Sequence, residues 1–157
     1  MSKFPLKNFF KAAYEFTLVF LQFFIISLHF FKWEFISEKQ IIQVTPFSHF
    51  VGFLIIIIAS IILLVAIKDL GRNLSPFPRP INNSNLVTTG IYRFTRHPMY
   101  YSLIFISIGV FIIKLSFYYL FLTISLSLII KFKIALEEKY LMNKFKNYLL
   151  YKNEVKV

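Results

Sequence analysis

The stretch from Phe47 to Ile67 constrains the fold of this chain more than any other part of the sequence. It contains no Lys, Arg, Asp or Glu, and four consecutive isoleucines lie at its centre. A helix needs about 20 apolar residues to cross the hydrocarbon core of a bilayer, which matches this stretch. Hydrophobic residues make up 57% of the chain, against roughly 45–50% in soluble domains. The sequence therefore predicts an all-α integral membrane protein, because helices satisfy their own backbone groups in lipid.

Two other parts of the chain are similarly apolar. Residues 12–31 predict a first span, and because they lack a small-residue cleavage site we do not expect a signal peptide there. Residues 99–130 are interrupted by Lys114 and are too few for two full crossings, which need about 40 residues. We therefore expect a tight hairpin of two short helices with Lys114 at its tip.

The polar tail that follows, from Lys131 onward, predicts a separate amphipathic helix. Its apolar face holds Ile134, Leu141, Phe145 and Leu149. At 157 residues the chain has room for one domain. Residues 1–68 supply two N-terminal spans, and residues 69–157 supply a loop, the hairpin and the C-terminal helix. The expected fold is a polytopic membrane bundle of about four hydrophobic helices plus this C-terminal helix.

The distribution of the net charge of +11 predicts the topology. Fifteen of the 18 Lys and Arg residues lie before the first span, in the central loop or in the tail, and three lie in the first connection and at the hairpin tip. Because positive residues flank membrane spans on the cytoplasmic side, we expect both termini and the central loop in the cytoplasm. The charges form no single basic stripe, so we do not expect nucleic-acid binding.

The residue types present exclude several kinds of enzyme site. Without cysteine there is neither thiolate catalysis nor a cysteine-based metal site, and the three histidines are too scattered for a metal centre. Nucleotide-binding glycine loops, serine-hydrolase elbows and zinc-protease motifs do not occur. We expect Glu15, His29 and His49, which lie near the ends of the first two spans, to be solvated at the membrane interface.

The central loop, residues 68–96, carries all four arginines and leads into a dense polar motif. Residues 90–100 read G-I-Y-R-F-T-R-H-P-M-Y. Pro98 suits the first turn of a helix, since its missing N–H would be unpaired there anyway, so we expect a helix to begin at His97 or Pro98. The N-terminus of that helix, beside Arg96, would attract a carboxylate or a phosphate.

The tail offers further polar residues on the same predicted side of the membrane: Glu137, Glu138, Tyr148 and Tyr151. Glu138 falls on the apolar face of the tail helix, and a buried carboxylate needs a partner or a ligand. The alternative is that the two glutamates simply favour the first turn of a helix. Together, the loop and the tail suit a zwitterionic cofactor whose carboxylate meets the helix end and whose hydroxyls meet a glutamate.

These motifs resemble the signature of the isoprenylcysteine carboxyl methyltransferase-like family of integral membrane proteins, which has relatives among phospholipid N-methyltransferases. The approach L-G-R-N-L-S-P-F-P-R-P and the tail E-E-K-Y-L-M-N-K-F-K-N-Y-L-L-Y also match its pattern, so the resemblance covers residues 69–155. The chain departs from the pattern at Ile91, where proline is frequent, and at Lys146, where glycine is common. The sequence given ends at Val157, before an arginine that the family often carries.

The resemblance implies a methyltransferase that uses S-adenosylmethionine to modify a lipophilic or lipid-attached substrate, such as an isoprenylcysteine carboxylate, at the cytoplasmic membrane face. The residues it assigns to the cofactor pocket are Tyr92, Arg96, His97, Pro98, Tyr100, Glu137, Glu138, Tyr148 and Tyr151. It identifies no dedicated catalytic residue and no metal. Two alternatives stay open, a phospholipid N-methyltransferase and a non-catalytic membrane scaffold that retains the fold. A membrane reductase with a nicotinamide cofactor has a similar architecture, but no residues here argue for it.

Overall fold

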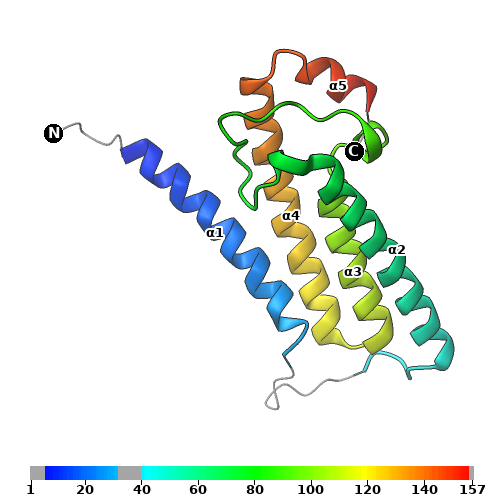
Figure 1. Cartoon of the computed structure of the whole chain (residues 1–157). Coiled ribbons are helices and arrows are strands. Elements are labelled where there is room, and N and C mark those ends of the chain that lie inside the picture. Colours follow the sequence, from blue (N-terminus) through cyan, green and yellow to red (C-terminus); the bar gives the residue numbers. More distant parts are fainter. Residues whose placement is uncertain (1–5, 32–39, 156–157) are drawn as a thin grey trace.

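A computed structural model describes residues 6–31 and 40–155, and every regular element in these residues is a helix (Figure 1). The long helices are α1 (Leu6–Leu28), α2 (Pro46–Leu70), α3 (Pro98–Lys114) and α4 (Phe117–Lys144). Two short 3-10 helices, η1 (Gly71–Asn73) and η2 (Gly90–Arg93), lie in the central loop, and α5 (Tyr148–Glu154) follows α4. The predicted all-α bundle with four hydrophobic helices is confirmed.

Local sequence explains where α2 and α3 begin and where α3 ends. Thr45 Oγ1 accepts from the Ser48 N–H at 3.2 Å, and Ser48 Oγ accepts from the Thr45 N–H at 3.1 Å, which together cap α2. His97 is the N-cap of α3 and Pro98 is its first residue, as the sequence predicts. Leu115, with a φ of 44°, ends α3 and lets the chain turn directly into α4.

The hairpin of α3 and α4 is confirmed, but its second arm is longer than the sequence predicts. Helix α4 continues without a break past Lys131 to Lys144, so the separate helix expected to begin at Lys131 is wrong. The helical run ends at Phe145, and α5 is a short helix of 7 residues. The physical reason is that a helix leaving the hydrocarbon core changes from apolar to polar side chains without any break in its backbone.

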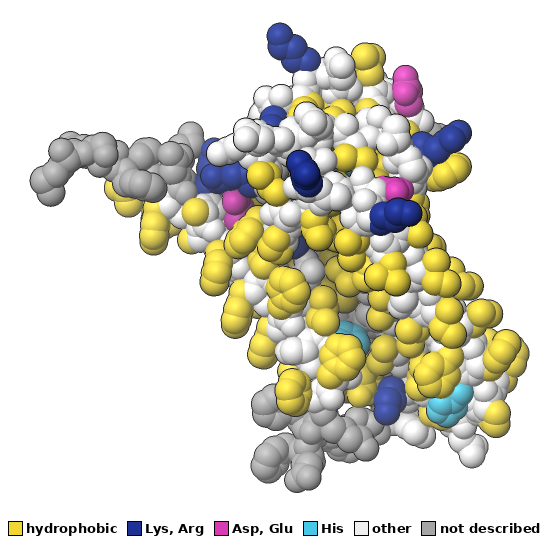
Figure 2. Space-filling view, in the orientation of Figure 1, with side chains coloured by type: hydrophobic (Ala, Val, Ile, Leu, Met, Phe, Trp, Pro, Cys, Tyr) yellow, Lys and Arg dark blue, Asp and Glu magenta, His cyan; other side chains and the backbone are white. Residues whose placement is uncertain are grey.

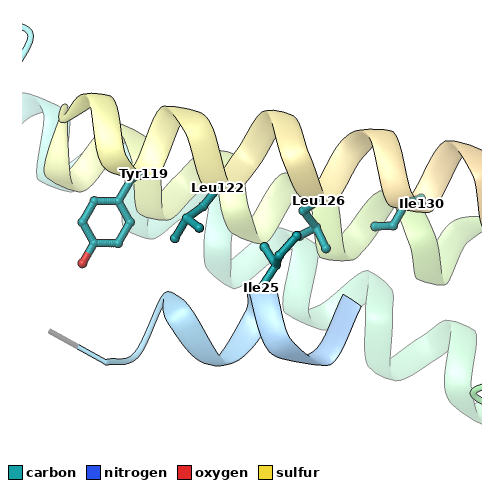
Figure 3. Packing of buried hydrophobic residues seen from close by; sticks show 5 residues of the cluster. All are labelled: Ile25, Tyr119, Leu122, Leu126 and Ile130. Atoms are coloured by element: carbon teal, nitrogen blue, oxygen red, sulfur yellow. The ribbon is translucent and has the colours of Figure 1, made fainter. Parts of the chain in front are cut away.

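An apolar cluster joins α1 to α4, which lies between α1 and α3 (Figure 1). The residues of this cluster that lie on α4 are Tyr119, Leu122, Leu126 and Ile130. They are spaced three or four residues apart, which places them on one face of the helix. Figure 3 shows this face beside Ile25 of α1, the fifth buried member of the cluster.

Small residues hold α2 close to α3. Gly52, Ala59 and Ala66 recur every seven residues on α2, and all three are buried. A Cβ atom on Gly52 would lie 2.7 Å from the carbonyl oxygen of Gly109, and one on Gly109 would lie 2.9 Å from that of Gly52. The two backbones therefore touch at this crossing, a mode of packing common between membrane helices.

Within the described part of the chain, three helical segments are long and apolar enough to cross a membrane: Phe9–Leu28, Pro46–Asn73 and Phe117–Lys144. Helix α3 has 17 residues and spans about 26 Å, less than the roughly 30 Å of a hydrocarbon core. Apolar side chains cover the long sides of the bundle, whereas Lys and Arg gather mainly at the end that carries the central loop and α5 (Figure 2). The start of α1 and the end of α4 lie at this same end (Figure 1).

Two of the three residues expected to be solvated at the interface are engaged with the protein. Glu15 is buried and accepts hydrogen bonds from Arg79 Nη2 at 2.9 Å and from the Tyr140 hydroxyl, because α1 packs beside α4 and the central loop. His29 is half-buried, and its Nε2 lies 2.8 Å from Ser107 Oγ. The expectation is therefore wrong for both. His49 is exposed.

Candidate functional site

A cavity of about 350 Å³ lies where the central loop meets α1, α2, α3 and α4. Its polar wall is formed by Gln22, Ser75, Tyr92, Arg96, His97, Tyr100, Lys133 and Glu137. Its apolar wall includes Phe23, Ile26, Leu63, Ile67, Met99 and Leu103. Because the apolar side chains come from the apolar helices, the cavity joins a polar end to a lining suited to lipid chains. Its volume is in the range that holds a small organic ligand.

The buried side chains of Arg96 and His97 meet one carboxylate, that of Glu138. Arg96 Nη2 lies 2.9 Å and Nε lies 3.0 Å from Glu138 Oε1, and His97 Nε2 lies 3.3 Å from the same oxygen. Lys152 Nζ, from α5, lies 2.7 Å from Oε2. Both oxygens of Glu138 therefore have partners, and the partner that a buried carboxylate needs comes from the protein itself. We call these four residues the cation cluster.

The cation cluster also fastens α5 to the bundle. Arg96 Nη1 donates to the carbonyl oxygen of Lys152 at 3.0 Å and to that of Val155. Carbonyl groups at the end of a helix have no partner within the helix, so a guanidinium is well placed to satisfy them. Arg96 thereby links the start of α3 to α4 and to the end of α5.

Glu137 faces the cavity rather than the cation cluster. Tyr100 Oη donates to Glu137 Oε2 at 2.7 Å. Among the described residues, no Lys or Arg nitrogen lies within ion-pair distance of this carboxylate. A smaller cavity of about 70 Å³ under the central loop is also lined by Glu137, together with Ser75 and Leu70. Of the two adjacent glutamates, Glu137 is therefore the one with hydrogen-bonding capacity left for a ligand.

Three tyrosines complete the surroundings of the cation cluster. Tyr151 Oη donates to the carbonyl oxygen of Tyr92 at 2.6 Å, which ties α5 to η2. Tyr148 is fully buried, and its hydroxyl has no hydrogen-bond partner within the described part of the chain. Burial raises the pKa of Tyr151 to about 12, and it also raises the pKa values of Tyr92 and Tyr148. All three phenols are therefore neutral at physiological pH.

The structure gathers the predicted site residues at one end of the bundle, but only some of them line the cavity. The five that do are Tyr92, Arg96, His97, Tyr100 and Glu137. Glu138 belongs to the cation cluster, and Tyr148 and Tyr151 pack beside it with ring centroids 6.0 Å apart. Pro98 lines a separate groove between α2 and α3.

Gln22 and Lys133 also line the cavity, although neither is among the site residues predicted from the sequence. Lys133 Nζ donates to Gln22 Oε1 and, at 3.0 Å, to the carbonyl oxygen of Pro76. The signal in the sequence is a polar residue inside an apolar stretch. Gln22 interrupts the first span, and Lys133 stands between Phe132 and Ile134. Lys133 is missed because the pattern assigns it to a polar tail rather than to α4.

Comparison with known proteins identifies the family of the chain. No curated protein matches it. The sequence profile of the phospholipid methyltransferase family matches residues 47–148, which is more than half of the chain and runs from the start of α2 to the start of α5. The match includes the motif at residues 90–100 and both glutamates of α4, and it extends the resemblance seen in the sequence to α2. The chain therefore belongs to the phospholipid methyltransferase family of integral membrane methyltransferases.

Proposed function

We propose that this protein transfers a methyl group from S-adenosylmethionine to a lipophilic acceptor at the cytoplasmic face of the membrane. The observation that carries the proposal is the cavity, in which His97 and Glu137 lie beside apolar side chains from the long helices. A polar cofactor and a lipid would meet in such a space. Membership of the family supplies the class of reaction.

The residues that line the polar end fit this cofactor. When bound, S-adenosylmethionine would supply an electrophilic methyl group on a sulfonium: an in-line nucleophile would form a bond to the methyl carbon while the C–S bond breaks and S-adenosylhomocysteine leaves. Glu137 would accept hydrogen bonds from the ribose hydroxyls, since its carboxylate faces the cavity with Tyr100 as its hydrogen-bond partner. The ring of Tyr100, whose centroid lies 5.8 Å from that of His97, offers an aromatic face of the kind that binds a cationic centre. Glu138 would act through Arg96 and His97, because its own oxygens are already paired.

The contribution of the protein to the reaction would be positioning. Holding two reactants in line is worth several powers of ten in rate without any acid–base group. The five predicted site residues of the polar wall would fix the cofactor, the apolar wall would admit the acceptor from the bilayer, and both would exclude water. A carboxylate acceptor is already a nucleophile, whereas an amine acceptor must first lose a proton. An isoprenylcysteine carboxylate and a phospholipid amine are the two acceptor types this site would serve.

Calorimetry tests the proposal directly. Detergent-purified protein with a cooperative thermal unfolding transition is titrated with S-adenosylhomocysteine, the product form of the cofactor. We expect saturable binding at one site per chain, and no heat with NADPH. A folded protein that binds no S-adenosylhomocysteine up to millimolar concentration would show the proposal to be wrong and would favour the non-catalytic scaffold.

A further inference from the structure

Lys133 is a cation buried inside the cavity wall, and its hydrogen-bond partners are neutral. Only 1% of the surface of this residue is exposed. Its Nζ donates to Gln22 Oε1 and to the carbonyl oxygen of Pro76, and it lies 5.2 Å from the centroid of the Tyr100 ring. Among the described residues, no carboxylate oxygen lies within ion-pair distance of it.

In the part of the chain that the structure describes, this arrangement leaves Lys133 with an unused hydrogen-bond donor. An ammonium group has three N–H donors, and two of them are taken by the oxygens of Gln22 and Pro76. A buried charge is costly unless it is paired, and two neutral oxygens compensate it only in part. The other two site cations differ, because Arg96 and Lys152 both bind the Glu138 carboxylate. Of the residues that the structure describes, Lys133 is therefore the cation of the cavity wall without a carboxylate at ion-pair distance, although the Glu137 carboxylate is near enough to interact with it electrostatically.

The position of Lys133 indicates which kind of anion would reach it. It precedes Glu137 by one turn of α4, a rise of about 6 Å. Since α4 runs towards the end that carries the central loop (Figure 1), Lys133 lies on the membrane side of Glu137. Its neighbours in the cavity wall include Phe23 and Ile26 of α1. An anion bound there would arrive together with apolar groups, as a lipid headgroup does.

We propose that Lys133 binds an anionic group of the lipid acceptor and so sets the acceptor class. The acceptor is then a lipid whose headgroup carries a phosphodiester or a carboxylate in addition to, or as, the group that receives the methyl. Lys133 is a specificity residue in this assignment, held in place by Gln22 and Pro76. The assignment rests on the proposed function, because only a methyltransferase has a methyl acceptor. The binding of the lipid is nevertheless measurable without methyl transfer.

The experiment measures lipid binding by calorimetry in a non-ionic detergent. The probes are dihexanoyl phosphatidylethanolamine, which carries a phosphodiester, N-acetyl-S-farnesylcysteine, which carries a carboxylate, and dihexanoylglycerol, which carries neither. The variants are Lys133→Met, Lys133→Gln and Lys133→Arg. Lys131→Met is the matched control, because Lys131 lies on the same helix and is exposed. Each variant is also titrated with S-adenosylhomocysteine, and its thermal unfolding midpoint is recorded.

We expect the wild-type protein to bind at least one of the two probes that carry an anionic group tenfold or more tightly than dihexanoylglycerol. Lys133→Met and Lys133→Gln should abolish that preference, Lys133→Arg should keep most of it, and Lys131→Met should leave it unchanged. The anionic probe that is preferred identifies the source of the anion. Binding of S-adenosylhomocysteine should change less than threefold in every variant.

Two results would overturn the assignment. One is an anionic-lipid preference that survives in Lys133→Gln. The other is a loss of S-adenosylhomocysteine binding in Lys133→Gln as large as the loss of lipid binding, which would assign Lys133 to the cofactor. Failure of the wild-type protein to bind S-adenosylhomocysteine while the lipid preference persists would instead contradict the proposed function alone. Lys133→Gln retains a polar side chain next to Gln22 and Pro76, so it still tests the assignment if Lys133→Met does not fold.

Discussion

Arg96 and Glu138 are joined through a single carboxylate oxygen, with Arg96 Nη2 at 2.9 Å and Nε at 3.0 Å from Glu138 Oε1. Both side chains are largely shielded from solvent, at 7% and 11% exposure. The pair connects the loop motif to α4 and, through Lys152, to α5. We therefore expect the pair to contribute mainly to the stability of the fold. The neighbouring Glu137 differs, because its carboxylate faces the cavity.

Replacing Glu138 should destabilise the fold. In Glu138→Gln the side chains of Arg96, His97 and Lys152 lose their common anion, and breaking a buried ion pair costs roughly 3–5 kcal/mol. We expect a lower thermal unfolding midpoint in detergent and faster proteolysis in α5. Glu154→Gln, an exposed change on α5, is the control and should leave both unchanged. An unchanged midpoint in Glu138→Gln would contradict the structural role.

Replacing Glu137 should act on ligand binding instead. Loss of a charged hydrogen bond to a ribose hydroxyl costs about 1.5–3 kcal/mol, so Glu137→Gln should weaken binding of S-adenosylhomocysteine about 10- to 100-fold. The thermal midpoint without ligand should stay close to that of the wild type, because Glu137 has Tyr100 rather than a cation as its partner. Calorimetry with S-adenosylhomocysteine measures the loss of binding in Glu137→Gln and in Glu138→Gln side by side. Normal ligand binding by Glu137→Gln would remove this residue from the cofactor site.

Gly90 should tolerate no side chain. Its φ of 62° is in the left-handed region, and an added Cβ would lie 2.0 Å from Asp69 Oδ2, the oxygen that accepts from the Ile91 N–H at 2.7 Å. Gly90→Ala should therefore lower the thermal midpoint by displacing Asp69 from η2. Gly71→Ala is the matched control, since Gly71 has a φ of 53° but nothing within 4 Å of its Cβ position. Equal losses in the two variants would show that backbone strain alone is responsible.

Close contact between α2 and α3 should make Gly52 and Gly109 interdependent. Gly52→Ala and Gly109→Ala each place a methyl group within 3 Å of the opposing carbonyl oxygen, so each should cost about 1–3 kcal/mol. Because one separation of the helices relieves both clashes, the double variant should lose less than the sum of the two losses. Unfolding in a denaturing detergent measures this, with Ser60→Ala on α2 as a control. Strict additivity would argue against a shared crossing.

Cysteine labelling tests the topology, because the chain contains no cysteine of its own. We expect Asn83→Cys, in the exposed central loop, to react with a membrane-impermeant thiol reagent applied from the cytoplasmic side. Lys114→Cys, at the far end of α3, should react only after the membrane is permeabilised. Equal labelling of both before permeabilisation would rule out the expected orientation.

Features that depend on neighbouring residues were predictable, and those that depend on helix packing were not. The start of α3 follows from the fixed backbone of Pro98, and the hairpin turn follows from the polarity of Lys114 within an apolar stretch. The partners of Glu138 depend on α3 and α5 meeting α4, which no spacing within one helix reveals. The place of Lys133 in the cavity wall likewise depends on α1, whose Gln22 reaches it across 111 positions of sequence.

Helix α1 ends before the residues that match the family profile begin, since that match starts at residue 47. Yet α1 supplies Gln22, Phe23 and Ile26 to the wall of the cavity. One side of the cavity is thus built from sequence that the family match does not include. Two chains that agree at every matched position could therefore differ in this wall, so the lining of the cavity can change while the residues of the family profile stay the same.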